Sequence, residues 1–265
     1  MQHYVFSCNY NHTMLTTQRK HLILARLAAD GQILAKALAA ELGTSEDTIR
    51  RDLRELAQEG KLQRVHGGAL PASAAVANLA VRAEVSTDDK VALGRAGAAM
   101  VQPGQLVLLD GGTTALQVAR HLAPDLRATI VTHSPTVAVA LAQHPHLEII
   151  VLGGRLYRHS MVNVGTAVIE AAARYRADLF FMGVTGVHPE AGLSTGDSEE
   201  ADVKRALSAR AAETVVLASS EKLMAASAFV IAPVQALATL VVPAGTAATT
   251  VRGFRKAGVT VVATP

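Results

Sequence analysis

Short apolar segments rich in Val, Leu and Ile recur along the last two thirds of the chain, and they constrain its fold more than any other feature. They are LVLL (106–109), TIV (129–131), EIIVL (148–152), DLFFM (178–182), TVVLA (214–218), ATLVV (238–242) and VTVV (259–262). Segments with a helical pattern lie between several of them, at 114–122, 135–143, 165–175 and 199–212. Such alternation is typical of a mainly parallel sheet covered by helices, so we predict an α/β domain over residues 88–265.

The composition fits a well-buried globular protein with an aliphatic core. Only 3% of the residues are aromatic and 18% are charged, below the usual ~25%. The only cysteine, Cys8, excludes an intrachain disulfide and favours a reducing compartment. No apolar run reaches the ~18 residues of a membrane span, and residues 1–13 lack the features of a signal peptide. We therefore expect a cytoplasmic protein without a membrane partner, and either a disordered leader or a mis-assigned start over 1–13.

Three short helical patterns and a glycine-centred hairpin fill the first part of the chain. The helices are expected over 17–30, 34–42 and 45–59, with Gly43 permitting a tight turn before the third and Ser45 as its N-cap. The segment KLQRVHGGAL (61–70) can form two short strands about its glycines. This order predicts a winged helix-turn-helix domain over 14–71, followed by a linker and connecting helix over 72–87.

The third helix carries the residues that could read DNA. Its core side faces inward through Ile49, Leu53 and Leu56, which leaves a cationic face pointing outward. Arginine can donate two parallel hydrogen bonds to guanine, and aspartate can accept a hydrogen bond from cytosine. With cationic residues of the wing added for phosphate or minor-groove contacts, the predicted DNA-binding set is Asp47, Thr48, Arg50, Arg51, Arg54, Lys61, Arg64 and His66.

A solvated helix face is the alternative interpretation of these charges. Asp47 and Arg51, and also Arg51 and Glu55, are spaced four residues apart and could pair in water without any DNA. The net charge of the whole chain is only +3, so affinity for nucleic acid must come from local placement of charge. The preceding helix pair and the following wing favour DNA.

A glycine loop after the first predicted strand of the α/β domain suggests an anion site. In LVLLDGGTTALQVARHL (106–122), Asp110 ends the strand, Gly112 allows close approach of the backbone, and Thr113 and Thr114 open a helix. Free N–H groups and the positive end of the helix dipole suit a phosphate there. An ordinary strand-to-helix turn with a Thr cap remains the alternative, and no Walker motif follows.

Further polar residues follow other strands, where ligands collect in open α/β sheets. Ser134 caps the helix after 129–131, Arg155 adjoins a second glycine pair, and Lys222 follows 214–218. Lys204 lies four residues after Glu200, so the two could form a surface ion pair, or Lys204 could reach a ligand while Glu200 orients it. Arg155 could equally face solvent from an ordinary turn, and Lys222 could equally be solvated. No metal or cofactor site is predicted.

The first part of the chain resembles the signature of DeoR-type bacterial transcription regulators, in which an IRRDL helix precedes an RxHGGA wing. The pieces TIRRDL (48–53), EG (59–60) and RVHGGA (64–69) stand in the same order and spacing here. Residues 88 to about 242 resemble the sensor domain of the same family. The resemblance implies sequence-specific binding to double-stranded operator DNA, usually as a repressor of carbohydrate or sugar-phosphate genes.

The resemblance also implies a sensor similar in fold to ribose-5-phosphate isomerase and coenzyme A transferases, which typically binds phosphorylated sugars. The effector residues carried over are Asp110, Gly112, Thr113, Thr114, Ser134, Lys204 and Lys222. We add Arg155 from its position. Three departures stand out: Gly111 where the family usually has Ser, His133 where it usually has Asn, and SSEK (219–222) where it often has DSSK. A changed ligand or a weakened site would follow from them.

Three functions are therefore open. The leading one is a homo-oligomeric repressor, dimer or tetramer, whose reading heads are controlled by a phosphorylated sugar. The second is an isomerase-like enzyme using Asp110, Asp178, Glu200 and Lys222 as acid–base groups, which ranks lower because a fold carries no chemistry with it. The third is a DNA-binding protein whose sensor domain serves only assembly. We expect a regulator and not an enzyme.

Overall fold

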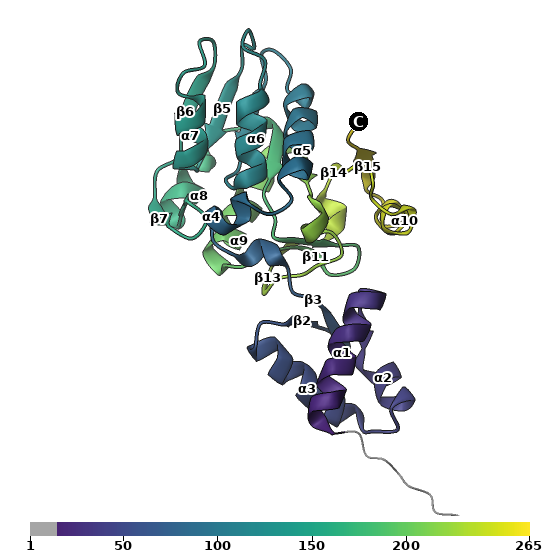
Figure 1. Cartoon of the computed structure of the whole chain (residues 1–265). Coiled ribbons are helices and arrows are strands. Elements are labelled where there is room, and N and C mark those ends of the chain that lie inside the picture. The colour runs from purple at the N-terminus through teal and green to yellow at the C-terminus, as the bar shows by residue number, and fades with distance from the viewer. Residues whose placement is uncertain (1–14) are drawn as a thin grey trace, which may run out of the picture. The chain divides into compact units, whose positions relative to one another are not determined.

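The computed structural model describes residues 15–265, and of Ala74 only the backbone. Within this part of the chain two compact units form, which divide between Pro71 and Ala72. The predicted leader, residues 1–13, lies outside the described residues. Both units are drawn in Figure 1.

The first unit consists of three helices and a small antiparallel sheet of order β1-β3-β2. The three predicted helices and the hairpin are all present, with ends shifted by at most one residue. An extra two-residue strand, β1, pairs with the hairpin and was not predicted. The elements are α1 (Thr16–Asp30), β1 (Ile33–Leu34), α2 (Ala35–Glu41), α3 (Glu46–Gln58), β2 (Leu62–Val65) and β3 (Gly68–Pro71).

Local chemistry sets the ends of α3. The Ser45 hydroxyl accepts a hydrogen bond from the backbone N–H of Thr48 at 3.1 Å, which satisfies one of the free donors of the first turn. Gly60, with φ of 71°, provides the left-handed residue after the helix. Ile49, Leu53 and Leu56 are all buried, as their spacing predicts, in a core shared with α1 and α2. The opposite side of α3 is therefore left to solvent.

A buried ion pair joins α3 to α1. The guanidinium of Arg19 donates to both carboxylate oxygens of Asp52, the Nη2–Oδ1 distance being 3.1 Å. Asp52 is fully buried, and its hydrogen bond raises the pKa of Arg19 further above the usual arginine value. Removal of one partner from such a pair leaves a buried charge without compensation. The pair therefore fixes the rotation of α3 against α1.

A parallel seven-stranded sheet forms the centre of the second unit, with strand order β15-β14-β12-β9-β4-β5-β6. Each of the seven apolar runs contributes one of its strands, so the predicted α/β class is confirmed. Their bounds are β4 (Leu106–Leu109), β5 (Thr129–Thr132), β6 (Glu148–Val151), β9 (Ala177–Met182), β12 (Ala211–Leu217), β14 (Thr239–Val242) and β15 (Thr260–Ala263).

Helices and short antiparallel strands surround this sheet. The helices are α4 (Leu79–Ala83), α5 (Thr87–Met100), α6 (Thr113–His121), α7 (Pro135–Leu141), α8 (Thr166–Ala172), α9 (Ser198–Ser208) and α10 (Ala248–Lys256). The further strands are β7 (Arg155–Tyr157), β8 (Val162–Val164), β10 (Gly186–His188), β11 (Gly192–Thr195) and β13 (Phe229–Ala232). Short 3-10 turns lie at η1 (Ala74–Val76), η2 (Ser220–Lys222) and η3 (Val234–Ala236). The predicted helix over 199–212 was too long, because its last residues already belong to β12.

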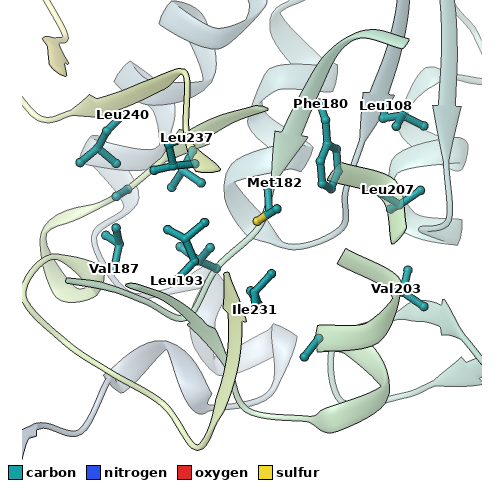
Figure 2. Packing of buried hydrophobic residues seen from close by; sticks show 14 of the residues in the cluster. Leu108, Phe180, Met182, Val187, Leu193, Val203, Leu207, Ile231, Leu237 and Leu240 are labelled. Carbon is teal, nitrogen blue, oxygen red and sulfur yellow. The ribbon is translucent and has the colours of Figure 1, made fainter. Parts of the chain in front are cut away.

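Two aliphatic cores cover the two faces of the sheet. Successive residues of a strand point to opposite faces, so Val107 and Leu109 join one core while Leu108 joins the other. The first core lies under α5, α6 and α7, of which α5 and α6 run side by side (Figure 1). The second packs α8, α9 and α10 against the other face. Figure 2 shows part of this core, including Phe180 of β9 and Leu207 of α9. Burial on both faces explains why these strands read as continuous apolar runs.

Candidate functional site

The outward face of α3 presents two uncommitted arginines. Arg51 and Arg54 are exposed, and neither forms an ion pair with another residue among those the structure describes. The pairs expected for a solvated face, Asp47–Arg51 and Arg51–Glu55, are not formed. Glu55 instead bonds Lys20 of α1 at 2.8 Å. Both guanidinium groups are thus free to bond bases or phosphates.

The remaining predicted DNA-binding residues also lie at the surface of the first unit. Arg50 is held by Glu46 at 2.7 Å, and Lys61 by Glu59 at the same distance. Thr48 bonds the Ser45 hydroxyl at 2.8 Å, which places it in the helix cap. The other three, all exposed, are Asp47, Arg64 and His66.

A cavity lies at the carboxyl ends of the central strands β4 and β9. From β4 the chain proceeds through β5 and β6 toward one edge of the sheet, whereas β9, β12, β14 and β15 continue toward the other. Ligands of open α/β folds bind at this switch in strand order. The cavity encloses about 550 Å³, its open mouth included. It is lined by the glycine loop Gly111–Gly112, by Thr113 and Thr114 of α6, and by Lys204 and Lys222.

Asp110 lies behind the glycine loop and organises it. Its Oδ1 accepts from the backbone N–H of Gly111 at 2.6 Å and from His133 Nε2 at 2.7 Å. Its Oδ2 accepts from the backbone N–H of Gly183 at 2.8 Å and from Lys204 Nζ at 2.6 Å. Burial alone would raise the pKa of this carboxyl, but Lys204 and His133 hold it well below its usual range. Asp110 is therefore a carboxylate that positions the loop rather than part of the cavity wall.

His133, which replaces the usual Asn, fits between two acceptors. The ring is fully buried, with Nδ1 2.7 Å from the carbonyl oxygen of Asn163 and Nε2 2.7 Å from Asp110. A ring that carries protons on both nitrogens donates to both partners. His133 thus links Asp110 at the end of β4 to Asn163 of β8.

Lys222 enters the cavity from the turn after β12. Its ammonium donates to the Thr114 hydroxyl at 3.2 Å. No carboxylate bonds it among the described residues, and burial, the main cause, lowers the pKa of Lys222 to about 8. A cation held beside the N-terminus of α6 without an anionic partner provides a place for an external anion.

Arg82 of α4 is a cavity residue that the sequence interpretation missed. The guanidinium Nε and Nη2 atoms are buried and have no hydrogen-bond partner within the described part of the chain. Its Nη1 would lie 3.7 Å from a Cβ placed on Gly112, so the group stands against the glycine loop. Burial lowers the pKa of Arg82 below the usual arginine value. Its signal in the sequence was a lone cation within the Ala-rich stretch 71–87.

Like Asp110, two further predicted effector residues are not part of the cavity wall. Ser134 is fully buried behind the loop and donates to the carbonyl of Met161 at 3.1 Å. Arg155 is exposed at the start of β7 and forms an ion pair with Glu199. Ser134 therefore supports the loop, while the position of Arg155 favours the solvated alternative.

The acidic residues near the sheet have separate positions. Glu200 lines the cavity and accepts from the Thr195 hydroxyl at 3.2 Å. Of the two alternatives for Glu200 and Lys204, the surface ion pair is not formed, because both residues are buried and Lys204 bonds Asp110 instead. Asp178 is the second residue of β9, at the opposite end of that strand, and accepts from the backbone N–H of Leu106 at 2.8 Å. The four proposed acid–base groups are thus not gathered at one place.

Comparison with known families matches both units. Residues 19–74 match the DeoR-like helix-turn-helix domain, and residues 85–243 match the DeoR C terminal sensor domain. The chain belongs to the DeoR family of transcriptional regulators. The HTH-type transcriptional repressor CsqR of Escherichia coli (strain K12) is 34% identical over 218 residues, which cover 82% of this chain and 84% of that protein. Because the curated relatives are named as transcriptional regulators or repressors, the prediction of a regulator rather than an enzyme is confirmed.

Solved structures also resemble this DeoR-family chain. The full-length sorbitol operon regulator SorC from Klebsiella pneumoniae aligns over 89% of this chain and 98% of its own, with 13% identity and a TM-score of 0.43. A ribose 5-phosphate isomerase from Methanocaldococcus jannaschii aligns over 52% of this chain and 54% of its own, with 19% identity and a TM-score of 0.39. No helix in the described part of the regulator is long and apolar enough to cross a bilayer.

Proposed function

We propose that this regulator is a repressor whose affinity for operator DNA is set by a phosphorylated sugar bound at the β4–β9 cavity. The third helix and the wing contact the duplex, and the protein acts in the cytoplasm, where the DNA is. Carbohydrate or sugar-phosphate genes are the proposed targets. The α/β unit is proposed as the sensing domain and the part up to Pro71 as the DNA-binding domain.

One observation supports the effector class most strongly. Arg82 and Lys222 both face the cavity beside the glycine loop, and neither has a carboxylate partner among the described residues. Two unpaired cations, free backbone N–H groups and the N-terminus of α6 match a phosphomonoester, which carries about −1.5 to −2 charges at neutral pH. A neutral sugar would leave both cations without compensation.

The rest of the cavity suits the hydroxyls of a sugar. Glu200 and Thr195 line it with a carboxylate and a hydroxyl, and Lys204 provides a donor already oriented by Asp110. Such groups can accept from and donate to a polyol, whereas a carboxylate would repel a second phosphate placed next to it. The arrangement therefore favours a ligand with one phosphate and several hydroxyls.

Repression requires two reading heads on paired half-sites, so we propose a homo-oligomer, dimer or tetramer. Coupling between effector and operator of ~1–3 kcal/mol would change operator affinity severalfold to about a hundredfold. The sign of this change is set by which state of the heads the effector favours.

A thermal-shift screen tests the effector class. Pentose and hexose phosphates are each compared with the parent sugar and with inorganic phosphate on the full-length protein. We expect stabilisation only by phosphorylated compounds, and any hit should change the affinity for a DNA fragment carrying the protein's own promoter. Stabilisation by the parent sugars alone, or by no compound, would contradict the proposal. Thr113→Ala at the glycine loop should blunt the thermal response and leave promoter binding without effector unchanged.

A further inference from the structure

We infer that Arg82 is the residue through which an anion in the cavity controls the connecting segment, here defined as residues 72–83, that follows the DNA-binding unit. The inference rests on the proposed anion site and adds the route by which occupancy of that site is transmitted. It concerns a residue in the part of the chain that the sequence predicted to be a linker and connecting helix.

The unpartnered state of the Arg82 guanidinium is the first observation. Nε and Nη2 are buried and lack hydrogen-bond partners among residues 15–265. Buried polar groups are nearly always hydrogen-bonded, and an unsatisfied charged donor is costly to the fold. Glu200 and Asp110 act on Arg82 only through space, without an ion pair. A planar fork with free donors is the geometry that binds a phosphate with two parallel hydrogen bonds.

The position of the guanidinium is the second observation. Arg82 lines the same cavity as Gly112, Thr113 and Lys222. Its Nη1 lies against the glycine loop, 3.7 Å from the Cβ that Gly112 lacks. An anion at the N-terminus of α6 would therefore meet the fork of Arg82 as well as the ammonium of Lys222. The three cations Lys90, Arg82 and Lys204 each contribute to lowering the pKa of Lys222, which shows how concentrated positive charge is here.

The attachment of the connecting segment is the third observation. The Ser73 hydroxyl donates to the carbonyl of Thr185, and Thr185 lines the cavity. The backbone N–H of Leu79 donates to the carbonyl of His159 at 2.9 Å, and His159 Nε2 lies 2.7 Å from the carbonyl of Val76. His159 precedes Ser160, which also lines the cavity. The segment is thus bonded to two loops of the cavity wall in addition to carrying Arg82.

The end of α4 is fixed by a second cation. Lys90 Nζ donates to the carbonyl oxygen of Arg82 at 2.6 Å and also to that of Val85. The same ammonium lies 3.6 Å from the carboxylate of Glu221, the neighbour of Lys222. A bound anion that bonds Arg82 would therefore act on α4, whose end Lys90 already connects to the turn that carries Lys222. The connecting segment follows the wing directly in the chain. We therefore expect occupancy of the anion site to change how well ordered this segment is.

Hydrogen–deuterium exchange of the full-length protein with inorganic phosphate as the probe tests this inference. In the parent protein we expect phosphate to slow exchange both in the glycine loop (110–116) and in α4 with its flank (79–84). In Arg82→Gln, protection of the loop should require about tenfold to hundredfold more phosphate, and that of 79–84 should be lost. Arg95→Gln, which removes an exposed arginine of α5, should behave as the parent protein.

The outcomes separate the inference from the proposed function. The inference would be overturned if phosphate protected the loop but left exchange at 79–84 unchanged. It would also be overturned if the Arg82→Gln protein responded as the parent does. Either result would leave the proposed anion site unaffected. No protection of the loop in the parent protein would overturn both. Arg82→Met distinguishes a ligand contact from a structural role, because removal of an unsatisfied buried charge should raise the Tm without ligand, whereas a lower Tm would contradict the inference.

Discussion

Lys204 Nζ lies 2.6 Å from Asp110 Oδ2, across 94 residues of sequence, and both side chains are buried. This pair joins α9 to the end of β4 beneath the cavity. Asp110→Asn removes the charge but not the shape, and it leaves the Lys204 ammonium buried without a counter-charge. We expect the α/β unit to lose about 3–5 kcal/mol of unfolding free energy in urea. Asp125→Asn, on an exposed turn, is the matched control and should change little.

A double variant sharpens this prediction. Asp110→Asn combined with Lys204→Met removes both charges, so it should be more stable than Asp110→Asn alone. If the double variant is as unstable as the sum of the two single ones, the pair makes no net contribution.

The contribution of Asp110 to the stability of the fold also depends on pH. The pKa of this carboxyl is depressed by folding, so its contribution is present above the unfolded pKa near 3.8 and is lost only as the pH falls below that value.

The pH dependence of anion binding should follow Lys222. Burial lowers the pKa of this ammonium to about 8, against 10.5 for the free group. Phosphate affinity should therefore fall as the pH rises above 8, while the stability of the free protein rises between 8 and 10.5, because the unfolded chain holds the proton longer. Binding should also weaken below about 6, where a sugar phosphate loses its second charge.

Isothermal titration calorimetry from about pH 5.5 to about pH 10, with a phosphorylated sugar found by the screen, measures the affinity trend, and urea unfolding measures the stability trend. Lys222→Met should bind weakly and show neither trend. An affinity that stays constant from pH 7 to pH 10 in the parent protein would exclude Lys222 as an anion ligand.

The packing around Gly111 explains its departure from the usual serine. A Cβ on Gly111 would lie 2.2 Å from Cγ1 of Val162, which closes the space behind the loop. Gly111→Ser should therefore cost about 1–3 kcal/mol of stability and weaken anion binding. Gly153→Ser, where nothing lies within 4 Å of the added Cβ, is the control. Val162→Ala should restore part of the loss in the double variant, and a lack of rescue would mean that the strain arises elsewhere.

The free arginines of α3 should dominate DNA recognition. Arg51→Ala is expected to cost about 1–3 kcal/mol on the promoter fragment and to relax base preference if it reads guanine. An equal loss on random DNA would instead assign it to the phosphate backbone. Arg26→Ala on α1, whose guanidinium already bonds Glu41, removes the same charge from the same unit and should have a much smaller effect. Fluorescence anisotropy at several salt concentrations separates the two contributions.

The sequence predicted the central sheet well because of where its strands lie. Strands covered on both faces are apolar at nearly every position, which produces runs such as LVLL (106–109) and LFFM (179–182). The short antiparallel strands, such as RLY (155–157) and GVH (186–188), carry no periodicity over three residues. The end of α9 was misplaced because small residues such as Ala211 and Ala212 suit a helix as well as the start of β12.

Only some of the cavity residues could be predicted from the sequence, because the roles of the others depend on tertiary contacts. Glycine loops and helix caps are local, so Gly112, Thr113 and Thr114 could be found from the order of residue types. Arg82 could not, since its role depends on which distant groups fail to pair with it in the folded state. Arg155 carried the same local signal as a ligand residue, yet tertiary structure gives it the exposed partner Glu199. Pairing of charges is a property of the fold, and a single sequence does not reveal it.

Gly68 of the wing lies so close to β1 that an added Cβ would stand 1.7 Å from the carbonyl oxygen of Ile33. The hairpin is thereby bonded to the chain between α1 and α2, with the N–H of Ala35 reaching the Gly67 carbonyl at 2.9 Å. Leu62 and Ala69 of the hairpin also share a core with Leu53 and Leu56 of α3, so we expect the hairpin and α3 to meet a duplex as one body. Promoters whose local groove width suits the spacing of the hairpin and α3 would be preferred even at base pairs that no side chain touches.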